Sequence, residues 1–169
     1  GEFPELQGIM GHFYAKNDGL SDDIAFAIED HYRPRFAGDQ LPRNSVGVCV
    51  ALADKLETLV GLFGIKQIPT GDKDPFALRR HALGVVRMLI EKELPLSLNT
   101  LLDKVKVSFA DKLTDPEETP LLFIYDRLAG SLREQGYQAQ EIDAVLSLMP
   151  DQLAEIPKRL DAVRAFSAL

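Results

Sequence analysis

Cysteine and long apolar runs are scarce in this sequence, and each scarcity excludes a class of protein. The single cysteine, Cys49, has no partner for an internal disulfide, which excludes a disulfide-stapled secreted domain and favours a reducing compartment such as the cytoplasm. Because Cys49 lies in the apolar run from Val46 to Ala53, we expect an inert thiol in the core. No apolar run approaches the roughly 20 residues of a membrane-spanning helix, so no membrane span is expected.

A targeting signal and an excess of basic residues are also missing. No basic segment leads into an apolar one near Gly1, so we expect no signal peptide, and a first residue other than Met indicates a piece of a longer protein. The chain has 19 Lys and Arg against 26 Asp and Glu, a net charge of −7. This balance argues against a dedicated nucleic-acid-binding domain but is compatible with a local basic patch.

No segment shows a convincing strand pattern, and apolar residues recur instead at helical spacing, so we predict an all-α fold. The most apolar helix, capped by Asn44 or Ser45, is expected to be the central buried one because apolar residues cover most of its circumference. Pro95 divides the chain into two predicted parts, residues 1–94 and 95–169. The helices are predicted at residues 4–16, 21–33, 44–63, 75–93, 97–113, 119–135, 139–148 and in a final segment with Pro157 in its first turn.

Positive charge is concentrated in residues 65–92, where six Lys or Arg face three Asp or Glu. Asp74 followed by Pro75 predicts a helix start in this segment, since an Asp side chain caps free N–H groups and the proline ring presets the helical φ. A second basic group surrounds Asp39 in a predicted loop over residues 34–43. Such residues can bind RNA phosphates or a partner chain, or form ion pairs inside the protein, and the residues leave these alternatives open. The candidates are Arg33, Arg35, Arg43, Lys66, Lys73, Arg79 and Arg80.

Asp54 lies on the predicted central helix, where a buried carboxylate would need a partner. We predict an ion pair with Arg79 or Arg80 that joins two helices, with a remnant of a catalytic or metal site as the alternative. The three histidines show no metal-ligand spacing, and neither a phosphate-binding loop nor a Ser-His-Asp arrangement is recognisable. We therefore expect no catalytic residue and no metal.

Four ordered blocks stand out in the sequence, namely Gln7–Gly11, His31–Asp39, Ala51–Leu59 and Pro69–Gly84. Together they resemble the beta subunit of bacterial glycyl-tRNA synthetase. The likeness runs from residue 2 to about 94, is most specific between Gly71 and Arg80, and is looser after Pro95. His81 stands where the family pattern has a small residue.

This resemblance implies a part of an enzyme with two alpha and two beta chains. The alpha chain would carry the class II catalytic core, which activates glycine with ATP and Mg²⁺, and the beta chain would contribute tRNA binding. Residues 1–94 would be the later part of a degenerate HD-type helical domain, with Asp54 at the position of its last metal-binding aspartate. Residues 95–169 would be a helical extension towards an anticodon-binding domain.

Three functions are compatible with these observations. We predict a fragment that contributes to tRNA binding and to assembly with the alpha subunit, with no catalysis or bound cofactor of its own. An HD-type metal-dependent phosphohydrolase is one alternative, and it would hold a metal. A purely structural module at the interface between subunits is the other.

Overall fold

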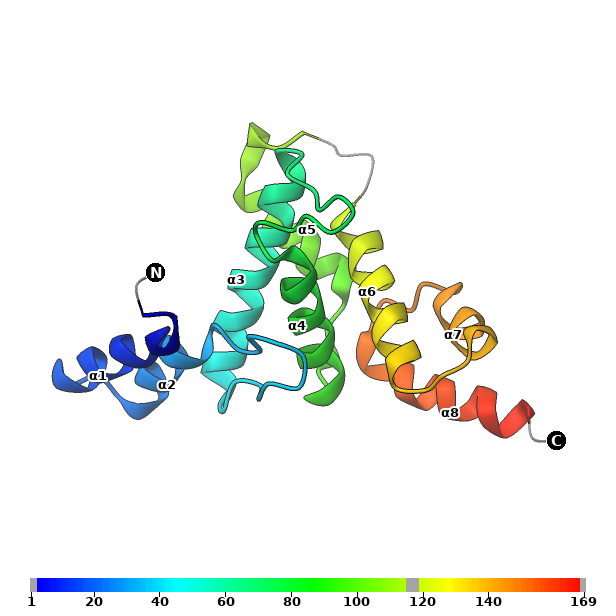
Figure 1. The fold of residues 1–169 in the computed structure, drawn as a ribbon, viewed down its shortest axis with the longest axis horizontal. Coiled ribbons are helices and arrows are strands. Elements are labelled where there is room, and N and C mark those ends of the chain that lie inside the picture. The colour runs from blue at the N-terminus through cyan, green and yellow to red at the C-terminus, as the bar shows by residue number, and fades with distance from the viewer. Residues whose placement is uncertain (1–2, 115–118, 168–169) are drawn as a thin grey trace. The chain divides into compact units, whose positions relative to one another are not determined.

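The computed structural model describes residues 3–114 and 119–167, whose regular structure is helical (Figure 1). These residues form eight α-helices and three short 3₁₀ helices and no strand, so the predicted all-α fold is confirmed. The α-helices are α1 (Ile9–Asn17), α2 (Asp22–Asp30), α3 (Ser45–Gly64), α4 (Leu78–Glu91), α5 (Leu98–Ser108), α6 (Pro120–Glu134), α7 (Ala139–Leu146) and α8 (Ile156–Ser167). The 3₁₀ helices are η1 (Pro4–Leu6), η2 (Ala110–Lys112) and η3 (Leu153–Glu155).

Contacts group the chain into two compact units, residues 1–55 and 56–169. The first unit holds α1, α2 and the first half of α3, and the second holds the remainder of α3 and all later helices. Within the second unit α4 packs against both α6 and η3. The domain division at residues 94 and 95 stays a prediction, and helices from both sides of it are in contact.

In the first unit, α1 and α2 form a close helical hairpin (Figure 1). A Cβ atom added at Gly11 would lie 2.7 Å from Cγ2 of Ile28, and one at Gly8 would lie 2.6 Å from the carbonyl oxygen of Glu29. Gly8 also has a φ of +83°, which costs glycine little. This conformation interrupts the helix predicted at residues 4–16, so the segment splits into η1 and α1.

The segment between α2 and α3 is irregular, as predicted, but it begins earlier than expected. Helix α2 ends at Asp30 rather than near Arg33, and the Asp30 side chain accepts a hydrogen bond from Arg43 in the loop before α3. Asn44 caps α3 as predicted, since its Oδ1 accepts a hydrogen bond of 2.7 Å from the backbone N–H of Gly47. The sequence therefore predicts the capping residue of α3 correctly, but it places the end of α2 a few residues too late.

Within the first unit, α3 is buried on one side only. Ala51 and Leu52 are buried, whereas Val46, Cys49 and Val50 are exposed. The prediction of an apolar helix buried around most of its circumference is therefore wrong for this half of α3, and so is the prediction of a core position for Cys49. An apolar residue type by itself predicts burial, but the position of a residue around the helix decides whether its side chain is buried.

The second unit has a continuous apolar core. Helix α4 is strongly amphipathic, with its buried face against α6 and η3. Tyr125 on α6 is buried as well and donates a hydrogen bond of 2.7 Å to the carbonyl oxygen of Pro150, while its burial raises the pKa of the phenol to about 12. The largest fully buried apolar side chains of this unit are Leu56, Leu59, Phe63, Leu78, Met88, Leu89, Leu98, Ile124, Leu128, Leu153 and Ile156.

The predicted caps of α5 and α6 are confirmed. Ser97 Oγ accepts from the N–H of Thr100 at 3.0 Å, and Thr119 Oγ1 accepts from the N–H of Leu122 at 3.3 Å. The start of α5 is further bound by Asp151, whose Oδ1 accepts from the N–H of Asn99 at 2.9 Å. Gly136 follows α6 with a φ of +87°, as expected of a residue that ends a helix.

Replacing Gly11 with alanine should destabilise the protein, because the new methyl group would collide with Ile28 between α1 and α2. We expect a loss of about 1 kcal/mol in the free energy of unfolding, since overpacking outweighs the gain in helix propensity. Gly130→Ala is the matched control, because open space surrounds Gly130 within α6 and the same change should stabilise by up to about 1 kcal/mol. Urea unfolding followed by circular dichroism measures both, and equal stabilisation by the two changes would contradict the close packing at Gly11.

Candidate nucleic-acid interface

Asp30 is the centre of an ion-pair network in the first unit. Its side chain is 0% exposed, and Arg43 binds it three times. Oδ2 accepts from the backbone N–H of Arg43 at 2.8 Å and from its Nε at 2.9 Å, and Oδ1 accepts from Nη2 at 2.8 Å. The guanidinium of Arg43 also lies 4.0 Å from the ring centroid of Phe26. Arg43 is therefore committed to holding the loop before α3 onto the end of α2.

Glu29 and Arg33 extend this network. Nη2 of Arg43 lies 2.8 Å from Glu29, and Arg33 lies 3.4 Å from both Glu29 and Asp30. Burial by itself would raise the pKa of Asp30, but the hydrogen bonds from Arg43 and the charge of Arg33 outweigh burial and hold this pKa below its ordinary value. Two carboxylates and two guanidinium groups thus neutralise each other inside the unit.

Arg35, in the loop that follows α2, is likewise paired with a carboxylate, that of Asp39. Asp39 is buried and accepts from the backbone N–H of Arg35 at 2.8 Å, from its Nε at 3.1 Å and from the N–H of Gln40 at 2.9 Å. Burial again favours the protonated acid, yet these hydrogen bonds lower the pKa of Asp39 below its ordinary value. Three of the seven predicted interface residues, Arg33, Arg35 and Arg43, therefore have structural partners.

Lys55 is a buried cation that the sequence reasoning missed. It is 2% exposed, and its Nζ donates a hydrogen bond of 2.9 Å to the carbonyl oxygen of His31. Asp54, expected to be the buried charge of this helix, is exposed instead. That expectation is wrong because Lys55, and not Asp54, shares the helix face of the buried residues Ala51 and Leu52. The ion pair between Asp54 and Arg79 or Arg80 stays a prediction.

In the second unit, α4 begins at Leu78 rather than at the predicted Pro75. Residues 74–77 form a turn that ends with Ala77 in the left-handed region, at a φ of 54°. Asp74 nevertheless caps the helix across this turn, because its two carboxylate oxygens accept from the N–H groups of Leu78 at 2.8 Å and Arg79 at 2.9 Å. The predicted capping residue is thus correct, and the helix start is displaced.

Arg79 fastens the preceding loop to α4. Its guanidinium donates to the carbonyl oxygen of Gly71, which lies between Thr70 and Lys73. Those two residues form a tight turn, with the N–H of Thr70 bonded to the carbonyl oxygen of Lys73 at 3.1 Å and the reverse bond at 2.9 Å. The segment from residue 65 to residue 77, called the basic loop below, is therefore anchored by Arg79 and Asp74 at the start of α4.

The basic loop presents the predicted cations that have no partner assigned. Lys66 and Lys73 are both exposed, and within the described part of the chain neither ammonium group has a hydrogen bond or an ion pair. Arg80 is exposed as well, but it already takes part in an interaction within the chain. Of the seven candidates, Lys66 and Lys73 are thus the ones available to an external anion.

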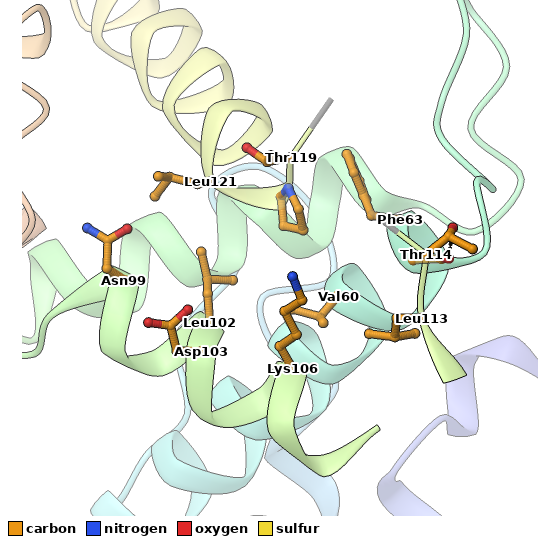
Figure 2. A pocket seen from close by; sticks show the side chains of 12 residues that line it. Val60, Phe63, Asn99, Leu102, Asp103, Lys106, Leu113, Thr114, Thr119 and Leu121 are labelled. Carbon is orange, nitrogen blue, oxygen red and sulfur yellow. Dashed lines mark hydrogen bonds between the residues drawn. The ribbon is translucent and has the colours of Figure 1, made fainter. Parts of the chain in front are cut away.

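A pocket of about 360 Å³ lies elsewhere in the second unit (Figure 2). Figure 2 shows Asn99, Asp103 and Lys106 along one side of α5, with the Lys106 ammonium directed towards the start of α6. Lys106 is not free of partners, and the rest of the lining is mostly apolar. The lining residues are Val60, Phe63, Gly64, Asn99, Leu102, Asp103, Lys106, Leu113, Thr114, Thr119, Pro120 and Leu121.

Neither a cluster of metal ligands nor a membrane-spanning helix occurs in the described ranges. Among residues 3–114 and 119–167, no three or more His, Cys, Asp and Glu side chains are placed to hold a metal ion together. None of the helices there combines the length and the apolar character needed to cross a bilayer.

Asp30→Asn should lower the free energy of unfolding by about 2 kcal/mol, because the neutral amide loses the charge-assisted hydrogen bonds that Arg43 donates to the buried Asp30 carboxylate. Asp18→Asn, an exposed acid in the same unit, should change it by less than about 0.5 kcal/mol. Urea unfolding at pH 7 compares the two variants. A loss at Asp30 no larger than that at Asp18 would show that the network does not stabilise the fold.

The lowered pKa values of Asp30 and Asp39 predict that the free energy of unfolding falls at acidic pH. Each carboxyl contributes fully above its unfolded pKa of about 3.9, and this contribution is lost as the pH falls through the lower folded value. We expect little change in stability from these groups between pH 7 and about pH 5, then a decline below about pH 4. Chemical unfolding between pH 3 and pH 7 measures this decline, which should be shallower in Asp30→Asn.

Comparison with known proteins identifies the family. The family model described as "Glycyl-tRNA synthetase beta subunit" matches residues 1–147. The chain is 70% identical over 169 residues to the glycine–tRNA ligase beta subunit of Paracidovorax citrulli (strain AAC00-1) and 69% identical to that of Acidovorax sp. (strain JS42). It is 68% identical over 170 residues to the beta subunit of Thiobacillus denitrificans (strain ATCC 25259 / T1).

Each of these alignments covers 100% of the chain and 24% of the relative. The chain therefore spans about a quarter of the length of the relatives that it matches. The family model covers most of the residues, and the resemblance of the four sequence blocks is confirmed. The chain belongs to the glycyl-tRNA synthetase beta subunit family.

Proposed function

We propose that this chain is part of the beta subunit of a glycine–tRNA ligase and that its basic loop contacts tRNA when glycine is attached. The observation that supports this contact is the exposure of Lys66 and Lys73 on a loop anchored by Arg79 and Asp74. Cations bind phosphates best when no internal acid neutralises them, because the affinity comes from displacing the counterions of the nucleic acid. Arg33, Arg35 and Arg43 do not meet this condition, since each has an internal carboxylate partner.

We assign the chemistry to the alpha subunit. ATP and Mg²⁺ would be bound there, in a class II catalytic core, and this part of the beta chain would hold no cofactor, metal or catalytic residue. The complete enzyme would contain two alpha and two beta chains in the cytoplasm, and this chain would also contribute to their assembly. The descent of residues 1–94 from an HD-type domain rests on the sequence resemblance alone.

The test is to replace Lys66 and Lys73 with alanine in the full-length beta chain purified with its alpha subunit. We expect weaker tRNA binding and slower charging with unchanged assembly, because exposed side chains are removed. The slope of log affinity against log salt should fall by about 1 for each lysine that contacts a phosphate. Filter binding at several salt concentrations, aminoacylation and size-exclusion chromatography measure the three quantities.

Lys104→Ala is the matched control, because Lys104 is an exposed lysine on α5 outside the basic loop. It should leave affinity, salt slope and assembly unchanged. Loss of assembly in the double variant would assign the basic loop to the subunit interface instead. Unchanged binding and charging would remove it from both roles.

A further inference from the structure

Helix α1 presents its largest apolar side chains to solvent. Met10, Phe13 and Tyr14 are 41%, 61% and 63% exposed. Their spacing of three and four residues places them on one face of the helix, called the outer face below. A contiguous group of two aromatic rings and a methionine is the composition of a protein contact surface, unlike a single apolar residue on a surface.

The opposite side of α1 explains why these side chains face outward. Small residues lie against α2, with Gly8 and Gly11 in the close approach and Ala15 buried. A helix with only one apolar neighbour buries its bulky residues against that neighbour. Here the small residues occupy the helix contact within the unit, and the bulky ones lie on the other side. Apolar residues on both sides of a helix are characteristic of a helix between two layers.

The exposed charges at the two ends of α1 are mainly acidic. Glu5 precedes α1, Asp18 follows it, and Asp22 and Asp23 begin the next helix; all four are exposed. Asp23 also accepts a hydrogen bond from the side chain of Asn44. The single lysine of α1, Lys16, is paired with Asp22, and this pairing lowers the pKa of Asp22. Acidic residues at both ends of α1 repel the phosphates of RNA and favour a partner with Lys or Arg flanking its apolar residues.

We propose that the outer face of α1 packs against an amphipathic helix with basic flanks, supplied by the part of the full-length beta chain that lies outside residues 1–169. The relatives are about four times as long as this chain, so most of the sequence available for such a contact lies outside these residues. A segment of the same chain also reaches the face at a high effective concentration. This contact is independent of the proposed tRNA contact, because it uses other residues and opposite charge.

The test places the photo-crosslinking residue p-benzoylphenylalanine at position 14 of the full-length beta chain, purified with its alpha subunit. Irradiation followed by mass spectrometry of the crosslinked peptides identifies the neighbour. We expect a crosslink within the same chain, to a segment outside residues 1–169 that carries Lys or Arg. A crosslink to the alpha subunit, to added tRNA or to residues 1–169, or no crosslink, would overturn the proposal.

A stability measurement checks the same contact without a crosslinker. Phe13→Ser combined with Tyr14→Ser should lower the melting temperature of the full-length protein by about 4 °C or more, because covered aromatic side chains are removed. Val107→Ser is the control, since Val107 is 77% exposed on α5 and has polar neighbours along the chain. An unchanged melting temperature in the double variant would show that the outer face faces solvent. In this double variant the salt dependence of tRNA binding should stay unchanged, which separates the result from that of the basic-loop test.

Discussion

The buried carboxylate of Asp30 is the constraint on which the first unit depends. A carboxylate that is removed from water must find charged or hydrogen-bonding partners, and Asp30 finds them in Arg43 and Arg33. The same contacts hold the loop before α3 against the end of α2. They also withdraw these arginines from any role that needs a free positive charge. Asp30 therefore limits which arginines can bind a nucleic acid, since Arg33 and Arg43 are already paired with it.

In the described part of the second unit, the basic residues of the loop before α4 are not neutralised by a buried carboxylate. Arg79 binds a backbone carbonyl and Asp74 caps α4, so the basic loop is anchored through groups that leave Lys66 and Lys73 exposed. The division of work is physically reasonable. Arginine has several donors in a planar group and suits the fixed internal contact, whereas a lysine is a mobile point charge that adapts to a phosphate backbone. Among the seven candidates, Arg33, Arg35, Arg43 and Arg79 hold the fold, whereas Lys66 and Lys73 are candidate contacts.

Much of the fold was predictable from residue patterns, because periodicity and capping are local. The all-α class and the caps at Asn44, Ser97 and Thr119 depend on residues within a few positions of each other. Errors arose where a distant contact or a backbone torsion decides. The start of α4 moved to Leu78 because Ala77 adopts a left-handed conformation. Lys55, in contrast, could have been found, since its spacing from Ala51 and Leu52 puts it on the buried face.

The sequence by itself determined the helical class, most helix positions, the family and the set of basic residues from which an interface could be built. Only the tertiary structure decided which of those cations are available, because the pairing depends on how the loop between α2 and α3 folds onto the end of α2. Arg43 and Asp30 are 13 residues apart and meet through three hydrogen bonds. The outer face of α1 was equally hidden in the sequence, where large apolar residues predict a core. Packing decides which side of a helix contacts its neighbour, and in α1 the side that contains the glycines packs against α2.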